Sequence, residues 1–185
     1  MAITTLNNRS INRSDTASAD QVWTATSATA SDFQVAGGAN TPAFHASLSA
    51  SVDISDATDT KLACDTELYD SDSAYDNSTN YRFTPQTAGK YLIYGSMTAT
   101  ESADTDMRNV SLMVHKNGSR VELFGINFRD SFTRTVEING STVVDMNGSS
   151  DYVELYVFAD TETNSPTIVG GTNQNCFFGA YKLIT

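Results

Sequence analysis

The segment from Asn80 to Gly95 constrains the fold more than any other part of this chain. It reads N-Y-R-F-T-P-Q-T-A-G-K-Y-L-I-Y-G, an aromatic strand end, a Pro/Gly turn and a second strand. In that second strand Tyr91 and Ile93 alternate with Leu92 and Tyr94, so large side chains point to both sides. We therefore expect a β-strand whose two faces are both covered.

A period-two pattern continues through the chain from Pro42 onward. Alternating apolar residues and polar turns recur about every ten residues, which predicts about eight to ten short strands and no helix of normal length. The dipeptides Asn117-Gly118, Asn139-Gly140 and Asn147-Gly148 are each expected to be turns. The further strand candidates are Phe44–Leu48, Thr60–Tyr69, Val110–Val114, Val121–Ile126, Phe132–Ile138, Ser141–Met146 and Tyr152–Phe158. The fold class predicted is an all-β antiparallel sandwich of the jelly-roll type.

Length and charge limit the function classes. A chain of 185 residues suits one medium domain and a tail. Its net charge of −11 argues against nucleic-acid binding, which needs clustered Lys and Arg. No apolar run approaches the roughly 20 residues that span a bilayer, so membrane insertion is not expected.

Residues 1–36 differ in composition from the rest and predict an extended N-terminal arm, with residues 37–185 forming the jelly-roll domain. Thr24–Ala30 is low-complexity, and Gly37-Gly38 marks a hinge. The candidate anchors of the arm, on a neighbouring chain or on its own domain, are Val22, Trp23 and Phe33. The chain opens without a basic and apolar leader, so we expect synthesis in a host cytoplasm without a signal peptide.

Cys64 and Cys176 are the only cysteines and are too few for a disulfide scaffold. Two buried thiols are favoured. A bridge stays conceivable, because the first and last strands of a jelly roll are neighbours.

Several motifs in order resemble the globular-head domain of complement, a relative of the tumour-necrosis-factor fold. The matching positions run from Pro42 to the end: Pro42-Ala43-Phe44-His45-Ala46, Tyr75-Asp76, Phe83, Pro85, Gly89, Tyr91, Asn117-Gly118, Val144–Gly148, Tyr152–Leu155, Phe177, Gly179 and Lys182-Leu183. Where that family usually has a glycine before Phe83, this chain carries Asn80-Tyr81-Arg82.

The resemblance implies a homotrimer in which outward aromatic residues of the late strands pack around a threefold axis. By position, the candidates for that trimer interface are Tyr156, Phe158 and Tyr181. The alternative is that they line the core of the sandwich, because aromatic residues favour both settings. Gly179, inside an aromatic strand, predicts the close approach of another backbone or ring.

The chain shows little chemistry of catalysis. His45 and His115 are its only histidines, and it lacks the G-x-S-x-G, P-loop, H-E-x-x-H and C-x-x-C motifs. We expect no enzyme activity and no cofactor. Asp70, Asp72 and Asp76 are weak candidates for calcium ligands, although solvated loop charge accounts for them better.

The opening of the chain, M-A-I-T-T-L-N-N-R-S-I-N, resembles the N-termini of tailed-bacteriophage virion proteins. The hypothesis is a non-enzymatic structural protein on the virion surface, attached to other capsid or tail proteins through its arm. Capsid decoration or a head fibre is favoured, because the chain has no heptads or repeats for a long shaft. The alternative is a tail-fibre tip or receptor-binding adhesin that recognises host-surface carbohydrate through loops such as Tyr69–Tyr75 and Asp160–Asn173.

Overall fold

The computed structural model describes residues 40–102, 106–128, 131–163, 165–171 and 175–184, together with the backbone of residues 21–25 and 31–35. The chain divides into two compact units, Met1–Gly38 and Ala39–Thr185. Each unit is described by itself.

The first unit contains a β-hairpin where the sequence predicted an arm without regular structure. β1 (Gln21–Ala25) pairs antiparallel with β2 (Ser31–Val35), and Trp23 lies opposite Phe33. Both runs contain the β-branched and aromatic residues that favour strands. The low-complexity stretch between the two runs obscured this strand pattern in the sequence. The side-chain contacts of Val22, Trp23 and Phe33 lie outside the described part of the structure, so their anchoring role stays a prediction.

The second unit is a sandwich of two antiparallel sheets. The first sheet has the order β11-β10-β13-β8-β7, with β5 also paired to β13. Its strands are β5 (Thr60–Lys61), β7 (Tyr75–Asp76), β8 (Arg82–Phe83), β10 (Met107–Lys116), β11 (Ser119–Asn127) and β13 (Val153–Thr161). The second sheet has the order β4-β14-β9-β15-β3-β6, with β12 also paired to β9. Its strands are β3 (Ala43–Ser47), β4 (Val52–Asp53), β6 (Thr66–Asp70), β9 (Gly89–Thr100), β12 (Thr135–Met146), β14 (Thr167–Ile168) and β15 (Phe177–Lys182).

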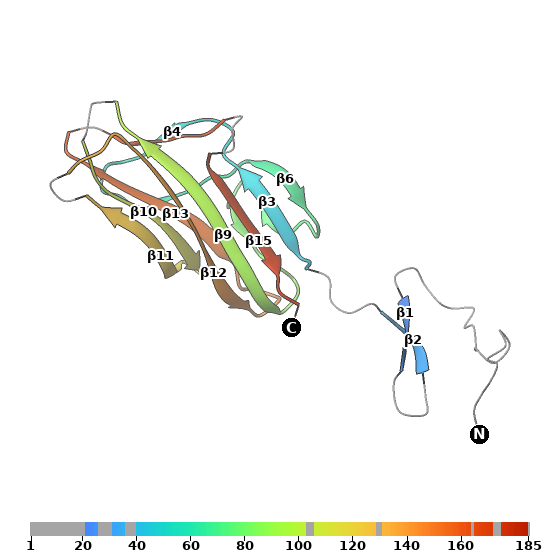
Figure 1. Cartoon of the computed structure of the whole chain (residues 1–185). Coiled ribbons are helices and arrows are strands. Elements are labelled where there is room, and N and C mark those ends of the chain that lie inside the picture. The colour runs from blue at the N-terminus through green and yellow to red at the C-terminus, as the bar shows by residue number, and fades with distance from the viewer. Residues whose placement is uncertain are drawn as a thin grey trace, which may run out of the picture. The chain divides into compact units, whose positions relative to one another are not determined.

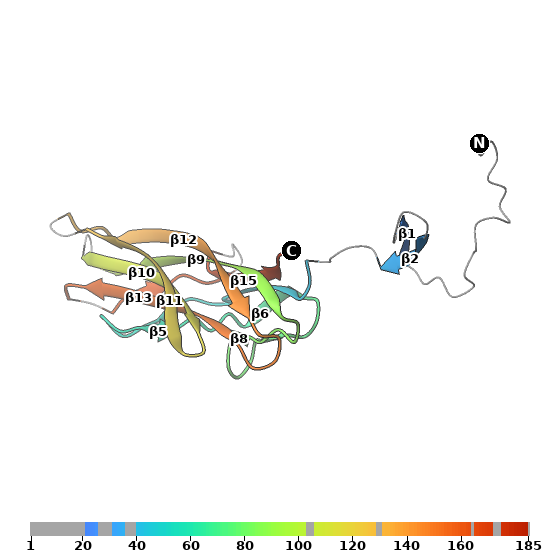
Figure 2. The same ribbon diagram turned by 90° about the horizontal axis from the view of Figure 1, so that it is seen from below.

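The two sheets form two layers, as Figures 1 and 2 show from directions 90° apart. β3 and β15 lie side by side although they are the first and last strands of the unit. The described residues contain no helix. These features confirm the predicted all-β jelly-roll sandwich. No helix long and apolar enough to cross a membrane occurs among the described residues.

The core lies between the layers and is rich in aromatic rings. Alternate residues of β9, β10 and β13 point inward, so that Tyr91, Ile93 and Leu155 are fully buried. Phe44 stacks on Tyr75 with ring centroids 4.3 Å apart. These contacts explain why β3, the first strand of this unit, has a large apolar residue on its inner side.

Two of the predicted turns occur and one does not. Asn117-Gly118 joins β10 to β11, and both residues have positive φ, 52° and 78°. Asn139-Gly140 instead lies inside β12, with Gly140 opposite Gly95 on β9. A Cβ on Gly140 would come within 2.4 Å of the Phe124 ring, so this glycine makes room for packing between the layers. The predicted turn at Asn139-Gly140 is therefore wrong.

Cys64 and Cys176 are free, buried thiols. Burial raises the pKa of the Cys64 thiol well above its usual value and raises the pKa of Cys176 to about 12. Both groups therefore stay protonated and unreactive at neutral pH.

Candidate functional site

The outer face of the second sheet carries a cluster of aromatic side chains that no other strand covers within the described unit. We call it the aromatic face and define it by His45, Tyr69, Tyr94, Phe177 and Tyr181. Register explains the cluster: His45 lies opposite both Tyr69 and Gly179, and Gly179 lies opposite Tyr94. Side chains that face each other across neighbouring strands share one side of the sheet.

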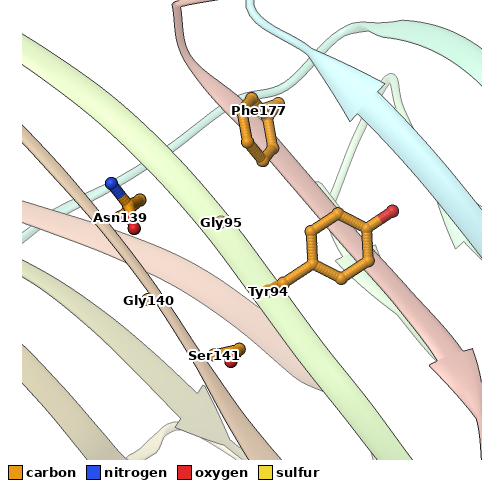
Figure 3. A pocket seen from close by; sticks show the side chains of 6 residues that line it. All are labelled: Tyr94, Gly95, Asn139, Gly140, Ser141 and Phe177. Carbon is orange, nitrogen blue, oxygen red and sulfur yellow. The ribbon is translucent and has the colours of Figure 1, made fainter.

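Gly179 forms the centre of the aromatic face. A Cβ at this position would lie 2.3 Å from Cζ of Tyr94, so the tyrosine ring occupies the space above the glycine backbone. Figure 3 shows this ring leaning from β9 toward β15, with Phe177 beside it. The predicted close approach of a ring to Gly179 is thus confirmed.

Hydrogen bonds and ring contacts tie the cluster together. The Tyr94 hydroxyl lies 3.2 Å from Nδ1 of His45 and 3.4 Å from the Tyr69 hydroxyl. The His45 ring stacks on Phe177 with centroids 5.1 Å apart. Burial lowers the pKa of His45 and, together with the Tyr69 hydrogen bond, raises the pKa of Tyr94, so both changes favour the neutral forms of His45 and Tyr94 at neutral pH.

A shallow hollow lies beside the Tyr94 ring on the side of β12. Its volume is about 320 Å³, and its lining comes from β9, β12 and β15: Tyr94, Gly95, Asn139, Gly140, Ser141 and Phe177. The ring leans toward β15 and leaves only the short side chains of Asn139 and Ser141 on the β12 side (Figure 3). The aromatic face is therefore contoured, with a ridge of rings next to a recess.

Charges lie at the rim of this sheet face. At one end Nζ of Lys90 and Oδ1 of Asp145 form an exposed ion pair at 2.7 Å. Between that pair and the rings lies Val143, which is opposite Leu92 on β9 and is 50% exposed. On this sheet face of a chain with a net charge of −11, the rings and Val143 thus form a partly apolar area between the ion pair at one end and the exposed Glu137 on β12.

The structure divides the predicted trimer residues between two faces. Tyr181 belongs to the aromatic face, whereas Tyr156 and Phe158 lie on the outer side of the other sheet, away from the core. Tyr156 stacks on His115 at 4.1 Å, and Phe158 lies opposite Ser111. The three are half-buried on outward positions, so they do not line the core, and no single sheet face contains all of them.

Sequence reasoning did not single out four members of the aromatic face: His45, Tyr69, Tyr94 and Phe177. One signal was available, because the alternation of Leu92, Tyr94 and Ser96 predicted a second covered side on that strand. The pairing of β15 between β3 and β9 brings the other rings to the same place, and that pairing is not visible in a local pattern.

Neither histidine is part of a nucleophile arrangement. His45 is bonded to a tyrosine, and His115 is stacked on Tyr156. In the part of the chain that the structure describes, neither imidazole is hydrogen-bonded to Ser or Asp, and no three His, Cys, Asp or Glu side chains gather as a metal site.

Two of the three weak calcium candidates, Asp70 and Asp76, accept hydrogen bonds from the backbone of their own loops. Asp70 accepts the backbone N–H groups of Asp72 and Tyr75. Asp76 accepts the backbone N–H groups of Ser78, Thr79 and Asn80. These bonds hold the carboxylates of Asp70 and Asp76 in turns, and Asp72 is exposed, so the geometry gives no support to a calcium site.

Comparison with known proteins supports the fold alone. No protein-family model and no curated protein sequence matches the chain. Among solved structures, Eiger TNF from S. frugiperda aligns with 13% identity and a TM-score of 0.53, over 76% of this chain and 91% of that chain. The globular domain of zebrafish complement 1qA protein aligns with 11% identity and a TM-score of 0.52, over 77% of this chain and 97% of that chain. Murine APRIL aligns with 10% identity and a TM-score of 0.54, over 76% and 98%.

Proposed function

We propose that the chain is a non-enzymatic structural protein that forms a homotrimer through the aromatic face. The observation that carries this proposal is the uncovered cluster of rings around Gly179. A soluble protein that left such a patch in water would risk aggregation, and burial against copies of itself removes that risk. Domains of the TNF and complement-head fold are often trimeric, which favours a trimer over other closed assemblies.

Charge also favours copies of this chain as the occupant. Like-charged molecules associate more easily through surfaces that are neutral, because exposed charges of one sign repel. The rings at the centre of the aromatic face carry no net charge at neutral pH, and on the same side of the sheet Lys90 and Asp145 form an ion pair, which leaves Glu137 as an exposed acid on β12. The centre of this face therefore offers a strongly acidic chain a neutral surface for association with itself.

A pair of matched substitutions tests the interface. Val143→Asp places a charge next to the rings, at a side chain that is 50% exposed. Val121→Asp places the same charge on β11 of the other sheet, at a side chain that is 48% exposed. Sedimentation velocity of the full chain should give a trimer for the natural protein and for Val121→Asp, and a monomer for Val143→Asp. A monomeric natural protein, or a trimer that survives Val143→Asp, would overturn the proposal.

We further propose that the trimer is displayed on a tailed-bacteriophage particle, with residues 1–38 attaching it to other virion proteins. What supports this is the separate N-terminal unit and its resemblance to phage virion N-termini. Capsid decoration is preferred to a tail-fibre tip because the chain has no shaft-forming repeats. Electron microscopy of virions labelled with an antibody against the jelly-roll unit would locate it. Label on the tail alone would favour the adhesin, and unlabelled particles would contradict both placements.

A further inference from the structure

Tyr81 has a backbone conformation that a tyrosine rarely adopts. Its φ of +49° lies in the left-handed region, which glycine enters without a steric cost and a bulky residue does not. Tyr81 ends the loop between β7 and β8, where a glycine would fit the turn better. A strained residue in a loop persists when its surroundings hold it in place, and such residues gather at binding sites.

The loop that carries Tyr81 is held on two sides. From inside the loop, Asp76 accepts the backbone N–H groups of Thr79 and Asn80 at 2.9 and 3.1 Å. From outside, Nζ of Lys61 donates to the carbonyl of Asn80 at 3.2 Å, and the Asn77 amide donates to the carbonyl of Asp65 at 3.3 Å. The position of Tyr81 is thus fixed relative to residues 61–65.

Of those residues, Lys61, Leu62, Ala63 and Asp65 line one cavity of about 300 Å³ together with Tyr81. We call it the Tyr81 pocket. Buried core residues, including Leu62 and Val157, form its apolar floor, and Asp53, Lys61 and Asp65 contribute polar groups. This volume is at the lower end of the range for small-molecule sites, which combine an apolar lining with a few placed polar groups.

The charges in the Tyr81 pocket favour a ligand with hydroxyl groups and no negative charge. Asp53 accepts a hydroxyl from Thr167 at 2.6 Å, and Asp65 accepts the backbone N–H and the hydroxyl of Ser49 at 2.9 and 2.6 Å. A carboxylate has about four acceptor sites, so both keep lone pairs for further donors. Glu154 lies 2.5 Å from Nζ of Lys61 and neutralises its charge.

We propose that the Tyr81 pocket binds a neutral sugar ring. The carboxylates of Asp53 and Asp65 accept hydrogen bonds from its hydroxyl groups, and the ring of Tyr81 covers its C–H face. An anionic sugar is rejected, because two carboxylates without a free cation face it. This site lies apart from the aromatic face and gives the adhesin alternative a specific ligand class, so its failure would leave the trimer proposal intact.

The first experiment is an NMR titration of the full-length protein with neutral and anionic sugars. The neutral probes are galactose, glucose, mannose and N-acetylglucosamine, and the anionic probes are N-acetylneuraminic acid and glucose 6-phosphate. At least one neutral sugar should shift the backbone amides of residues 49–53 and 81 with a millimolar dissociation constant, whereas the anionic probes should not. If no neutral sugar shifts these amides, or if an anionic probe shifts them equally, the proposal is overturned.

Substitutions of Tyr81 separate binding from folding. Tyr81→Gly removes the ring and relieves the strained backbone, so it should keep or increase the midpoint of thermal unfolding while weakening sugar binding about tenfold. Tyr81→Phe keeps the ring and should bind normally. Ser73→Gly, at another residue with positive φ outside the pocket, is the matched control and should change neither affinity nor ligand specificity. A Tyr81→Gly variant that binds sugar normally, or that unfolds at a lower temperature, would show that the ring has a packing role and would overturn the proposal.

Discussion

At the scale of single residues, Gly179 decides whether the aromatic face can form. Tyr94 reaches His45 and Tyr69 only by crossing the backbone of β15, and any side chain at position 179 would occupy that path. One missing methyl group thus allows three strands to share one hydrogen-bonded cluster.

Gly179→Ala should destabilise the folded chain by about 1–3 kcal/mol, because the new Cβ collides with the Tyr94 ring. In a Tyr94→Ala background the collision is absent, and the same substitution should cost less than about half as much. Urea unfolding of the four proteins measures this coupling. Additive effects of the two substitutions would contradict the contact.

His45 should make stability depend on pH. Burial lowers its pKa in the folded state below the ordinary value of 6.5, so the unfolded chain binds a proton first as the pH falls. The contribution of this group is complete above pH 6.5 and is lost progressively below it. Because burial also lowers the pKa of His115, the decline should be smaller in His45→Gln and absent in His45→Gln/His115→Gln. Urea midpoints between pH 7 and about pH 5 test this, and an unchanged decline in the double variant would contradict it.

At the scale of strands and turns, the sequence predicted local alternation well and long-range pairing poorly. The strand after Gly89 was expected to have two covered sides. Its inner side is buried, whereas Leu92 and Tyr94 on its outer side are only half-buried within the described unit, so cover for that side stays a prediction. The Asn139-Gly140 dipeptide was misassigned because Asn-Gly favours turns locally, whereas packing against Phe124 keeps β12 continuous there. Tertiary packing overrode a local preference.

The same limit explains the division of the predicted interface residues. Alternation shows that Tyr156 and Tyr181 point away from their strands' inner sides, but it cannot show which sheet each strand joins. β13 pairs with β10 in one layer, and β15 pairs with β9 in the other. Position along the chain therefore could not predict which of the outward aromatic residues share one sheet face.

The loop between β7 and β8 should depend on Asp76. Asp76→Ala removes its bonds to the backbone N–H groups of Ser78, Thr79 and Asn80, and should destabilise the fold by about 1 kcal/mol at neutral pH. These bonds lower the pKa of Asp76, so its contribution is present above its ordinary value of 3.8 and is lost as the pH falls further. Urea unfolding at pH 7 and at about pH 3 should therefore show a smaller difference between the two proteins at the lower pH. An equal difference at both would contradict this role of the carboxylate.

At the scale of the whole molecule, the face proposed for assembly and the pocket proposed for recognition are separate. The aromatic face covers the outer side of the second sheet, whereas the Tyr81 pocket is formed by loops around β4, β5 and β8. No residue of the aromatic face lines the Tyr81 pocket. The trimer and the sugar site can therefore be tested with different substitutions.

The N-terminal unit should be dispensable for the fold and required for attachment. The jelly-roll unit, Ala39–Thr185, contains its own closed core of residues from Phe44 to Ala180. Deleting residues 1–38 should therefore change the midpoint of thermal unfolding by less than about 2 °C and leave the trimer intact. Incubated with particles that lack the protein, the truncated trimer should fail to bind, while the full-length trimer binds.

Unfolding of the truncated chain would show that the first unit supports the core. Binding of the truncated trimer to particles would move the anchor into the jelly roll itself, where the β11 side chains of Val121, Leu123 and Ile126, each more than 40% exposed, would be the next residues to substitute.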